Sequence, residues 1–296
     1  MDQGNNDLKD IQPLLEFKIR KFPYVAYALG ITFIISAAYF IGAGMLTEII
    51  FGDEKMNFIA WINAAAQILF MLLPALLASI PVPLHYRELF RLNIRMDKII
   101  VLYSFMALIA FQFFVSGYAV LQDLIIPEKV ADEYDKLKDM IEEIYDTILG
   151  GESLYAFLRA MTAGAVVPAI AEETLFRGFL QRSLEERMRP ASAIALSGVF
   201  FGVIHFNPID MIPLVIIGLF LGFLAYAGRN ILLPIIIHFA NNAFAIIIFY
   251  SAEAQELESS AGELSPVFAA VLCFGGLLFV FLFCRLIYDR SRKSEY

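Results

Sequence analysis

The chain is short of the residues from which most secreted and nucleic-acid-binding domains are built. It has two cysteines and three histidines in 296 residues, and only 18% of its residues are charged. Cys273 and Cys284 are expected on one helix about 16 Å apart, too far for a disulfide between them. The formal charge is −8 and no basic stripe occurs, so nucleic acid is not an expected partner. The N-terminal residues lack a short apolar run before small residues, so no cleaved signal peptide is expected.

Long apolar runs dominate instead. Hydrophobic residues make up 59% of the chain, and a helix of about 20 such residues crosses about 30 Å of hydrocarbon. We therefore predict an all-α, polytopic membrane bundle of about eight transmembrane helices embedded in the lipid bilayer. The expected spans are Tyr24–Leu46, Phe58–Ile80, Ile99–Leu121, Leu154–Leu180, Ala191–Phe206, Ile209–Tyr226, Leu232–Tyr250 and Pro266–Ile287.

Lysine and arginine gather in alternate loops, whereas the loops between them are acidic or neutral. Because positive loops stay in the cytoplasm, both termini are expected there. We expect a multi-pass protein of the bacterial plasma membrane. The residues that carry this bias are Lys18, Arg20 and Lys21; Arg87, Arg91, Arg95 and Lys98; Arg182, Arg187 and Arg189; Arg229; and Arg285, Arg290, Arg292 and Lys293.

The longest loop, residues 123–152, has the periodicity of a helix. Its apolar residues recur every three or four positions, which predicts an acidic amphipathic helix on the outer surface or packed over the bundle. An ordered connector is favoured over a substrate gate. The apolar positions are Val130, Tyr134, Leu137, Ile141, Ile144 and Ile148.

Small residues repeat at four-residue spacing in two spans. Gly198 with Gly202, and Gly218 with Gly222, form small-x-x-x-small pairs. Such pairs let two helix backbones approach closely, so a tightly packed bundle is expected here.

Ionisable side chains within the spans are the feature that needs an explanation, because each costs about 2.5–3.5 kcal/mol near the bilayer centre. Glu173 precedes Arg177 by four residues, the favourable order for a helical ion pair. His238 and Asn242 share one helix face, and Glu172 points about 100° away from Glu173. The polar set is confined to three spans: Glu172, Glu173, Arg177, His205, His238, Asn241 and Asn242.

The depth of these residues poses a problem that the spans alone do not solve. Pro168 should kink its span at Gly164 because it removes a backbone hydrogen bond, and irregular backbone at membrane depth typically lines a cavity. His205 would lie about 21 Å from the cytoplasmic end if its span began at Ala191, deeper than the other polar residues. We therefore expect that span to begin inside the cytoplasm, or the loop after it to re-enter the bundle.

Three motifs occur in order on successive spans. Residues 172–177 read E-E-x-x-x-R, residues 201–205 read F-x-x-x-H, and residues 238–242 read H-x-x-x-N. Together they resemble the CAAX-protease and bacteriocin-processing family (CPBP, or ABI), which includes the type II CAAX prenyl endopeptidases. The resemblance covers about residues 154–250. It implies an intramembrane endopeptidase acting on membrane-associated or lipidated peptides or proteins.

The resemblance implies catalytic roles for four residues. Glu172 would activate water as the general base, assisted by His205, while His238 and Asn242 would stabilise the oxyanion. Amide hydrolysis needs such a base, a held water and donors for the developing negative charge.

The chain would divide into 1–150 with the first helices and the acidic helix, 151–252 as the catalytic core, and 253–296 with the last helix and basic tail.

Supporting roles and a metal are implied less directly. Glu173 and Arg177 would form a supporting ion pair, and Phe201 would position its helix or line the pocket. Glu172, His205 and His238 also offer a zinc ligand set with an open position. No H-E-x-x-H motif requires a metal, so we favour a mechanism without a cofactor and keep a zinc-dependent protease as the alternative.

Two other classes of function remain open at this stage. A non-proteolytic immunity or scaffold protein would keep the fold without using the site. An ion- or proton-coupled transporter also places charges inside the membrane, but transporters usually show internal repeats, and no clear halves occur here. His85, in a basic loop, is expected to be an ordinary interfacial residue. The substrate and its cleavage site are not encoded in any recognisable pattern.

Overall fold

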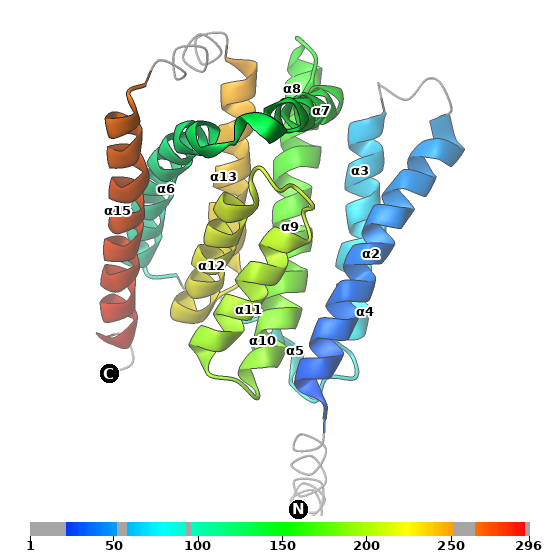
Figure 1. Cartoon of the computed structure of the whole chain (residues 1–296). Helices are drawn as coiled ribbons and strands as arrows, with labels where there is room; N and C mark the ends of the chain where they lie inside the picture. Colours follow the sequence, from blue (N-terminus) through cyan, green and yellow to red (C-terminus); the bar gives the residue numbers. More distant parts are fainter. Residues whose placement is uncertain (1–21, 52–57, 93–95, 252–263, 294–296) are drawn as a thin grey trace, which may run out of the picture.

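The structure is a computed structural model that describes residues 22–51, 58–92, 96–251 and 264–293. The described residues form helices and short turns, with no strand among them (Figure 1). The predicted all-α class is therefore confirmed. Lys18, Arg20, Lys21, Arg95 and the acidic loop 253–263 lie outside the described residues.

The helices follow one another as α2 to α15, and π-helical or 3-10 segments carry the prefix η. The N-terminal part contains α2 (Tyr24–Phe51), α3 (Ile59–Gln67), η2 (Ile68–Leu72), α4 (Leu73–Ala78), α5 (Tyr86–Leu89), α6 (Lys98–Ile125), η3 (Glu128–Val130) and α7 (Ala131–Leu149). The middle part contains α8 (Leu154–Ala160), η4 (Met161–Val166), α9 (Val167–Glu173), η5 (Thr174–Gln181), α10 (Arg182–Glu185) and α11 (Pro190–Val203). The last part contains α12 (Met211–Gly228), α13 (Leu232–Tyr250) and α15 (Pro266–Lys293).

Seven helical stretches of the described residues are long and apolar enough to cross a membrane, which makes this a multi-pass membrane protein. They are Tyr24–Leu46, Ile59–Ala78, Lys98–Ile125, Leu154–Glu185, Met211–Gly228, Leu232–Tyr250 and Pro266–Lys293. The start of α2 and the end of α15 lie at the same end of the bundle (Figure 1). That arrangement agrees with termini on one side of a membrane. The cytoplasmic placement of that side, and the division at residues 150 and 252, stay predictions.

The expected span Ala191–Phe206 differs from the other seven. It is the 14-residue helix α11, which at 1.5 Å per residue is about 21 Å long and falls short of the hydrocarbon thickness. The chain turns after Val203 and returns as α12, and this turn lies within the height of the bundle (Figure 1). Because α11 ends before it crosses the bundle, His205 lies in the turn after it, at the depth of the other motif residues.

The predicted amphipathic helix is confirmed as α7, which runs across one end of the bundle (Figure 1). Its acidic face is exposed, and Ile148 packs against a small cluster of alanines from α3 and η4. Arg159 of α8 donates to the Gly150 carbonyl oxygen at 2.5 Å, and the Tyr250 hydroxyl donates to the Leu149 carbonyl oxygen. The C-terminal end of α7 is therefore fixed to α8 and α13.

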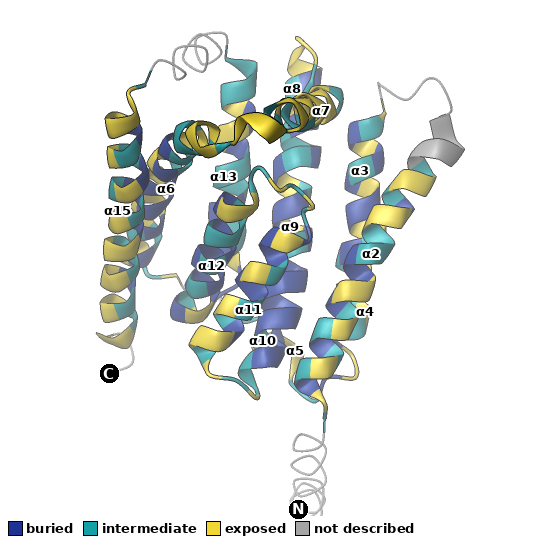
Figure 2. Cartoon of the chain, viewed as in Figure 1, coloured by how far each residue is buried: buried dark blue, intermediate teal, exposed yellow. Residues whose placement is uncertain are grey.

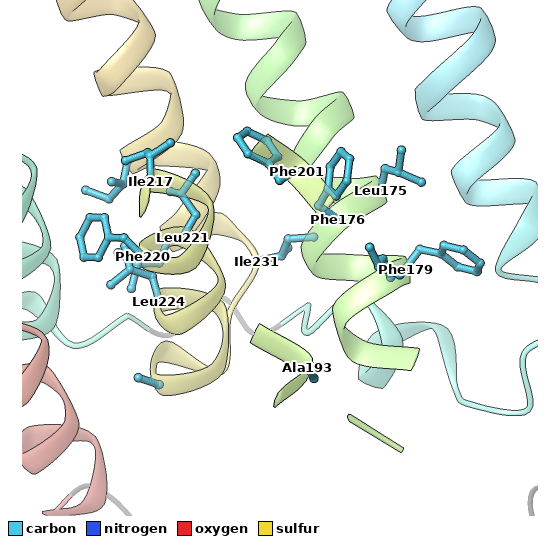
Figure 3. Close-up of a cluster of buried hydrophobic side chains, with 14 of the residues drawn as sticks. Leu175, Phe176, Phe179, Ala193, Phe201, Ile217, Phe220, Leu221, Leu224 and Ile231 are labelled. Atoms are coloured by element: carbon cyan, nitrogen blue, oxygen red, sulfur yellow. The ribbon is translucent and has the colours of Figure 1, made fainter. Parts of the chain in front are cut away.

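Burial is greatest where α9, η5, α11 and α12 meet, and α2 and α15 expose large apolar side chains outward (Figure 2). Such apolar exposure suits contact with lipid. The core between η5 and α11 is aromatic: the Phe176 and Phe201 rings meet edge to face with centroids 5.2 Å apart (Figure 3). This core holds the motif helices at fixed spacing.

Close packing of α11 on α12 depends on the predicted glycine pairs. A Cβ on Gly198 would lie 2.8 Å from the Leu219 amide nitrogen, and one on Gly202 would lie 2.8 Å from that of Val215. A Cβ on Gly218 would lie 2.8 Å from the Gly198 carbonyl oxygen. These contacts are backbone atoms that cannot rotate away, so the prediction of close approach is confirmed.

We predict that Gly198→Ala lowers the thermal unfolding midpoint of the purified chain by several degrees, because overpacking typically costs about 1–3 kcal/mol. Gly275→Ala in α15 is the matched control, since a Cβ there meets nothing within 4 Å. Alanine is otherwise favoured over glycine in a helix by about 1 kcal/mol. Equal midpoints for the two variants would contradict the packing described for α11 and α12.

Candidate active site

The motif residues come from one irregular helix and two neighbours. The chain from α8 to α10 is continuous but changes to π-helical geometry in η4 and again in η5. π-Helical turns inside α-helices occur frequently at functional sites. The predicted irregularity around Pro168 is confirmed, as a π-helical turn that ends just before it. Glu172 and Glu173 lie in the α-helical stretch between the two π segments.

Pro168 leaves an acceptor that Asn242 satisfies. Proline has no N–H to donate to the carbonyl four residues earlier, which is that of Gly164. The Asn242 side-chain Nδ2 donates to the Gly164 oxygen at 3.1 Å. A buried carbonyl without a partner costs about 1–3 kcal/mol, so Asn242 stabilises the break in the helix. The H-x-x-x-N motif thus has a structural use alongside its predicted catalytic one.

Glu173, Arg177 and His238 form a buried charged cluster. The Glu173 and Arg177 side chains are both 0% exposed, with Nε of Arg177 3.2 Å from Oε2 of Glu173. This contact is an ion pair by distance without hydrogen-bond alignment. Oε1 of Glu173 lies 2.9 Å from Nδ1 of His238. The expected ion pair is confirmed, and the same carboxylate holds a histidine from another helix.

Arg177 is also held from α12, through a backbone group. Its NH2 donates to the Gly218 carbonyl oxygen at 3.2 Å, and Gln181 donates to the Gly222 carbonyl oxygen at 3.0 Å. Both carbonyls belong to the small-x-x-x-small pair of α12. The absence of side chains at these glycines therefore does more than permit packing, because it leaves the Gly218 oxygen open to Arg177 and the Gly222 oxygen open to Gln181.

Glu172 faces two imidazoles. Its Oε2 lies 3.8 Å from Nε2 of His205 and 3.8 Å from Nε2 of His238. The same oxygen is buried and accepts no hydrogen bond from the described residues. The side chains are 13% exposed for Glu172, 29% for His205 and 6% for His238. The structure thus brings the three together, with the widest access on the His205 side.

The other nitrogen of each ring identifies the proton positions. Nδ1 of His205 lies 2.6 Å from the Phe201 carbonyl oxygen, which can only accept, so Nδ1 carries the proton. Nδ1 of His238 faces the Glu173 carboxylate, which accepts for the same reason. In the neutral rings both Nε2 atoms are then acceptors. Both Nε2 acceptors lie 3.8 Å from the Glu172 oxygen, and a water molecule beside them has two protons for two of these three acceptors.

Phe201 packs among these groups. The Arg177 guanidinium carbon is 4.5 Å from its ring centroid. The rings of His205 and His238 lie 4.7 Å and 5.9 Å from it. Phe201 therefore contacts the Arg177 guanidinium and both imidazole rings.

The zinc alternative can be tested against this geometry. Each imidazole has its Nδ1 held by an acceptor, the usual outer arrangement of zinc-bound histidine. Two ligands at about 2.0–2.2 Å from tetrahedral zinc lie about 3.3–3.6 Å apart, slightly less than the 3.8 Å separations seen here. No group of three or more His, Cys, Asp or Glu residues is placed to hold a metal ion within the described ranges. The donor types suit zinc, so the choice between a zinc-dependent and a metal-free site stays a prediction.

A chain of amides reaches the site from α6, which carries no motif. Gln112 Nε2 donates to Asn241 Oδ1 at 3.0 Å, and Asn241 Nδ2 donates to Asn242 Oδ1 at 3.3 Å. Asn242 then presents its NH2 group to Gly164. Each N–H donor makes the next side-chain amide turn its oxygen toward that donor and its nitrogen toward the following acceptor. Gln112 therefore determines the orientation of the Asn242 side chain. Sequence analysis missed Gln112, because one glutamine in an apolar span has no distinguishing spacing.

We predict that Gln112→Glu lowers the unfolding midpoint by several degrees, because a carboxylate cannot donate to Asn241 Oδ1. Either that oxygen loses its donor or both asparagines flip and turn Asn242 Oδ1 toward the Gly164 oxygen. Leaving one buried group unsatisfied costs about 1–3 kcal/mol.

Ser116→Ala is the control one turn along α6, since that hydroxyl bonds only within its own helix. Thermal unfolding of the purified variants measures both. If Gln112→Glu is as stable as Ser116→Ala, the amides do not form a directed chain.

Further polar groups on α2 and α3 flank the site and were not singled out from the sequence. The Tyr39 hydroxyl donates to Asn63 Oδ1 at 2.6 Å, and Gln67 interacts with the same hydroxyl. Contacts between α3 and α9 place these groups beside the helix that carries Glu172. They lie on two spans whose apolar composition hid them.

Comparison with known proteins agrees with the motifs. Residues 154–244 match the family model described as type II CAAX prenyl endopeptidase Rce1-like. Searches of the curated proteins and of the solved structures returned no significant match. The matched segment runs from the first residue of α8 into α13 and contains every motif residue from Glu172 to Asn242.

Proposed function

We propose that this chain, which carries the Rce1-like segment of the type II CAAX prenyl endopeptidases over residues 154–244, is an intramembrane endopeptidase that activates water with Glu172. The family points to a membrane-embedded endopeptidase, and the mechanism and substrate are our proposal. One observation carries it: Oε2 of Glu172 and the Nε2 atoms of His205 and His238 are convergent acceptors.

In the proposed reaction a water molecule donates hydrogen bonds to Glu172 and to one imidazole. As its oxygen attacks the scissile carbonyl carbon, Glu172 takes one proton, and the carbonyl π electrons move to the oxygen. Collapse of the tetrahedral intermediate expels the amine, which receives the proton from Glu172. The products are a carboxylic acid and an amine, so the atoms of peptide and water balance without another reagent.

Stabilisation of the oxyanion is assigned to Asn242 and His238. Asn242 has two N–H groups and uses one on Gly164, so the second is available to the intermediate. His238 donates from Nε2 only as imidazolium, with a proton other than the one that Glu172 transfers, and the Glu173 carboxylate, 2.9 Å from Nδ1, balances that charge. One oxyanion donor is typically worth about 10²–10³ in rate. Glu173 and Arg177 act as positioning residues, because they touch His238 and each other.

The substrate is proposed to be a membrane-associated or lipidated peptide. The candidate site lies among helices whose outer faces are apolar, and its more exposed side is at His205, in the turn between α11 and α12. A substrate whose lipid or apolar part lies in the bilayer can reach a site at that depth. This placement favours peptides tethered to the membrane over soluble ones.

The test is hydrolysis of a farnesylated peptide that ends in a C-a-a-X sequence, assayed with purified chain in detergent. We predict that Glu172→Gln and His238→Ala each lower kcat by at least about 10²-fold, since each removes a group that acts on the reacting atoms. His85→Asn is the matched control. His85 is exposed and caps α5 through Nδ1, a role that asparagine can fill.

The controls separate the remaining alternatives. Full activity in Glu172→Gln, or equal loss in His85→Asn, contradicts the proposed mechanism. Loss of activity after chelation, restored only by added zinc, would assign the zinc-dependent version instead. If the unaltered chain cleaves neither the farnesylated peptide nor membrane peptides captured on Glu172→Gln, the chain is not an endopeptidase.

A further inference from the structure

A polar cavity lies at the basic end of the bundle, and none of its lining residues belongs to the candidate active site. It has a volume of about 510 Å³, within the usual range of small-molecule sites. Its lining comes from the segment after α4, from α10 and the start of α11, and from the end of α12. The lining residues are Arg87, Glu88, Arg91, Leu92, Arg182, Glu185, Pro190, Tyr226 and Arg229.

Positive charge exceeds negative charge in this cavity. Four arginines and two glutamates line it, and Glu186 beside Arg182 reduces the formal excess to one positive charge. Arg91 pairs with Glu185 through NH2, and Arg182 pairs with Glu186 outside the lining. The Arg87 side chain is exposed and makes no ion pair with a described residue. The cavity therefore keeps donors for a further anion.

Arg91 is the clearest sign of a missing partner. Its side chain is 11% exposed, yet its NH1 is buried and makes no hydrogen bond to any described residue. Burial lowers the pKa of Arg91 from its usual value and the Glu185 carboxylate raises it in part. A buried guanidinium nitrogen without an acceptor is costly, and Arg91 is one of the residues that line the cavity.

Two of the arginines that line this cavity have a left-handed backbone conformation. Arg91 and Arg229 have φ of 45° and 48°, the left-handed region that costs a residue with a Cβ about 1–2 kcal/mol. The amide nitrogen of Ile231 donates to the Arg91 carbonyl oxygen at 3.3 Å, which joins the two strained turns. Left-handed residues commonly end helices, and here they set Arg229 at the end of α12 and Arg91 just after α5, beside the cavity.

The depth of the cavity identifies the ligand. Glu185 and Gly228 are the last residues of two membrane-spanning stretches, so the neighbouring arginines lie at the level of lipid phosphates. Arginine forms bidentate hydrogen bonds with phosphate, and Tyr226, Leu92 and Pro190 offer apolar surface for the glycerol part. We infer that this cavity binds the phosphate of an anionic phospholipid, with Arg87 and Arg91 as its main donors.

The test measures lipid binding by the full chain in detergent micelles, by native mass spectrometry with phosphatidylglycerol and phosphatidylcholine of identical acyl chains. We expect phosphatidylglycerol to bind at least about tenfold more tightly. Arg87→Gln should weaken that binding about tenfold, and Arg91→Lys, which keeps the charge but loses the planar fork, should weaken it as well. The measurement needs no peptidase activity, so it stands whether or not the proposed reaction is correct.

Arg189→Gln is the matched control, because Arg189 is exposed at the same end but does not line the cavity. It should leave binding unchanged. Equal binding of the two lipids, or equal weakening by Arg87→Gln and Arg189→Gln, would overturn the inference. So would inorganic phosphate that displaces the lipid with the same dependence on Arg87, because the cavity would then recognise a free anion. Arg87 is exposed, so its variant should fold even if Arg91→Lys does not.

Discussion

The buried ion pair of Glu173 and Arg177 is the interaction on which the arrangement of this bundle depends. Both side chains are fully enclosed, and removal of one partner of such a pair typically costs about 3–5 kcal/mol. The cost is avoided only while Arg177 reaches Gly218 and Glu173 reaches His238. One helix is thereby tied to α12 and to α13 at a single depth.

The irregular features of the fold follow from that requirement. The α11 helix ends early, so that the histidine after it lies beside Glu172 instead of at the far surface. The π-helical segment η5 turns Arg177 and Gln181 toward the carbonyls that the glycines of α12 expose. Pro168 interrupts the backbone one turn before the carboxylates, and Asn242 satisfies the carbonyl left open. At η5 and at Pro168 the departure from a regular helix is therefore accompanied by a hydrogen bond to a neighbouring helix.

The sequence predicted the parts of this structure that depend on composition and local spacing. Apolar runs predicted about eight spans, of which seven are long enough to cross a membrane. Period-3.6 apolar residues predicted α7, and the spacing of Glu173 and Arg177 predicted their ion pair. The convergence of Glu172, His205 and His238 followed from the three motifs. Their catalytic roles and the absence of a cofactor stay predictions, since geometry alone does not test them.

The remaining features depend on tertiary contacts that have no local pattern. The backbone acceptors at Gly164 and Gly218 have no side chain to recognise, so the partners of Asn242 and Arg177 were not predictable. Gln112 acts through two asparagines from a span outside the motifs. The α11 helix has the apolar composition of a full span, and only its packing on α12 shows that it turns back.

The tautomers of the three histidines test the central claim most directly, by ¹⁵N NMR of imidazole-labelled chain at a pH where the rings are neutral. We predict the proton on Nδ1 in His205 and His238, so that both Nε2 lone pairs face Glu172. His85 is the internal reference with the opposite tautomer, because its Nδ1 accepts from the Arg87 amide. A proton on Nε2 of His205 or His238 would contradict the account, since a donor would then occupy the place of an acceptor.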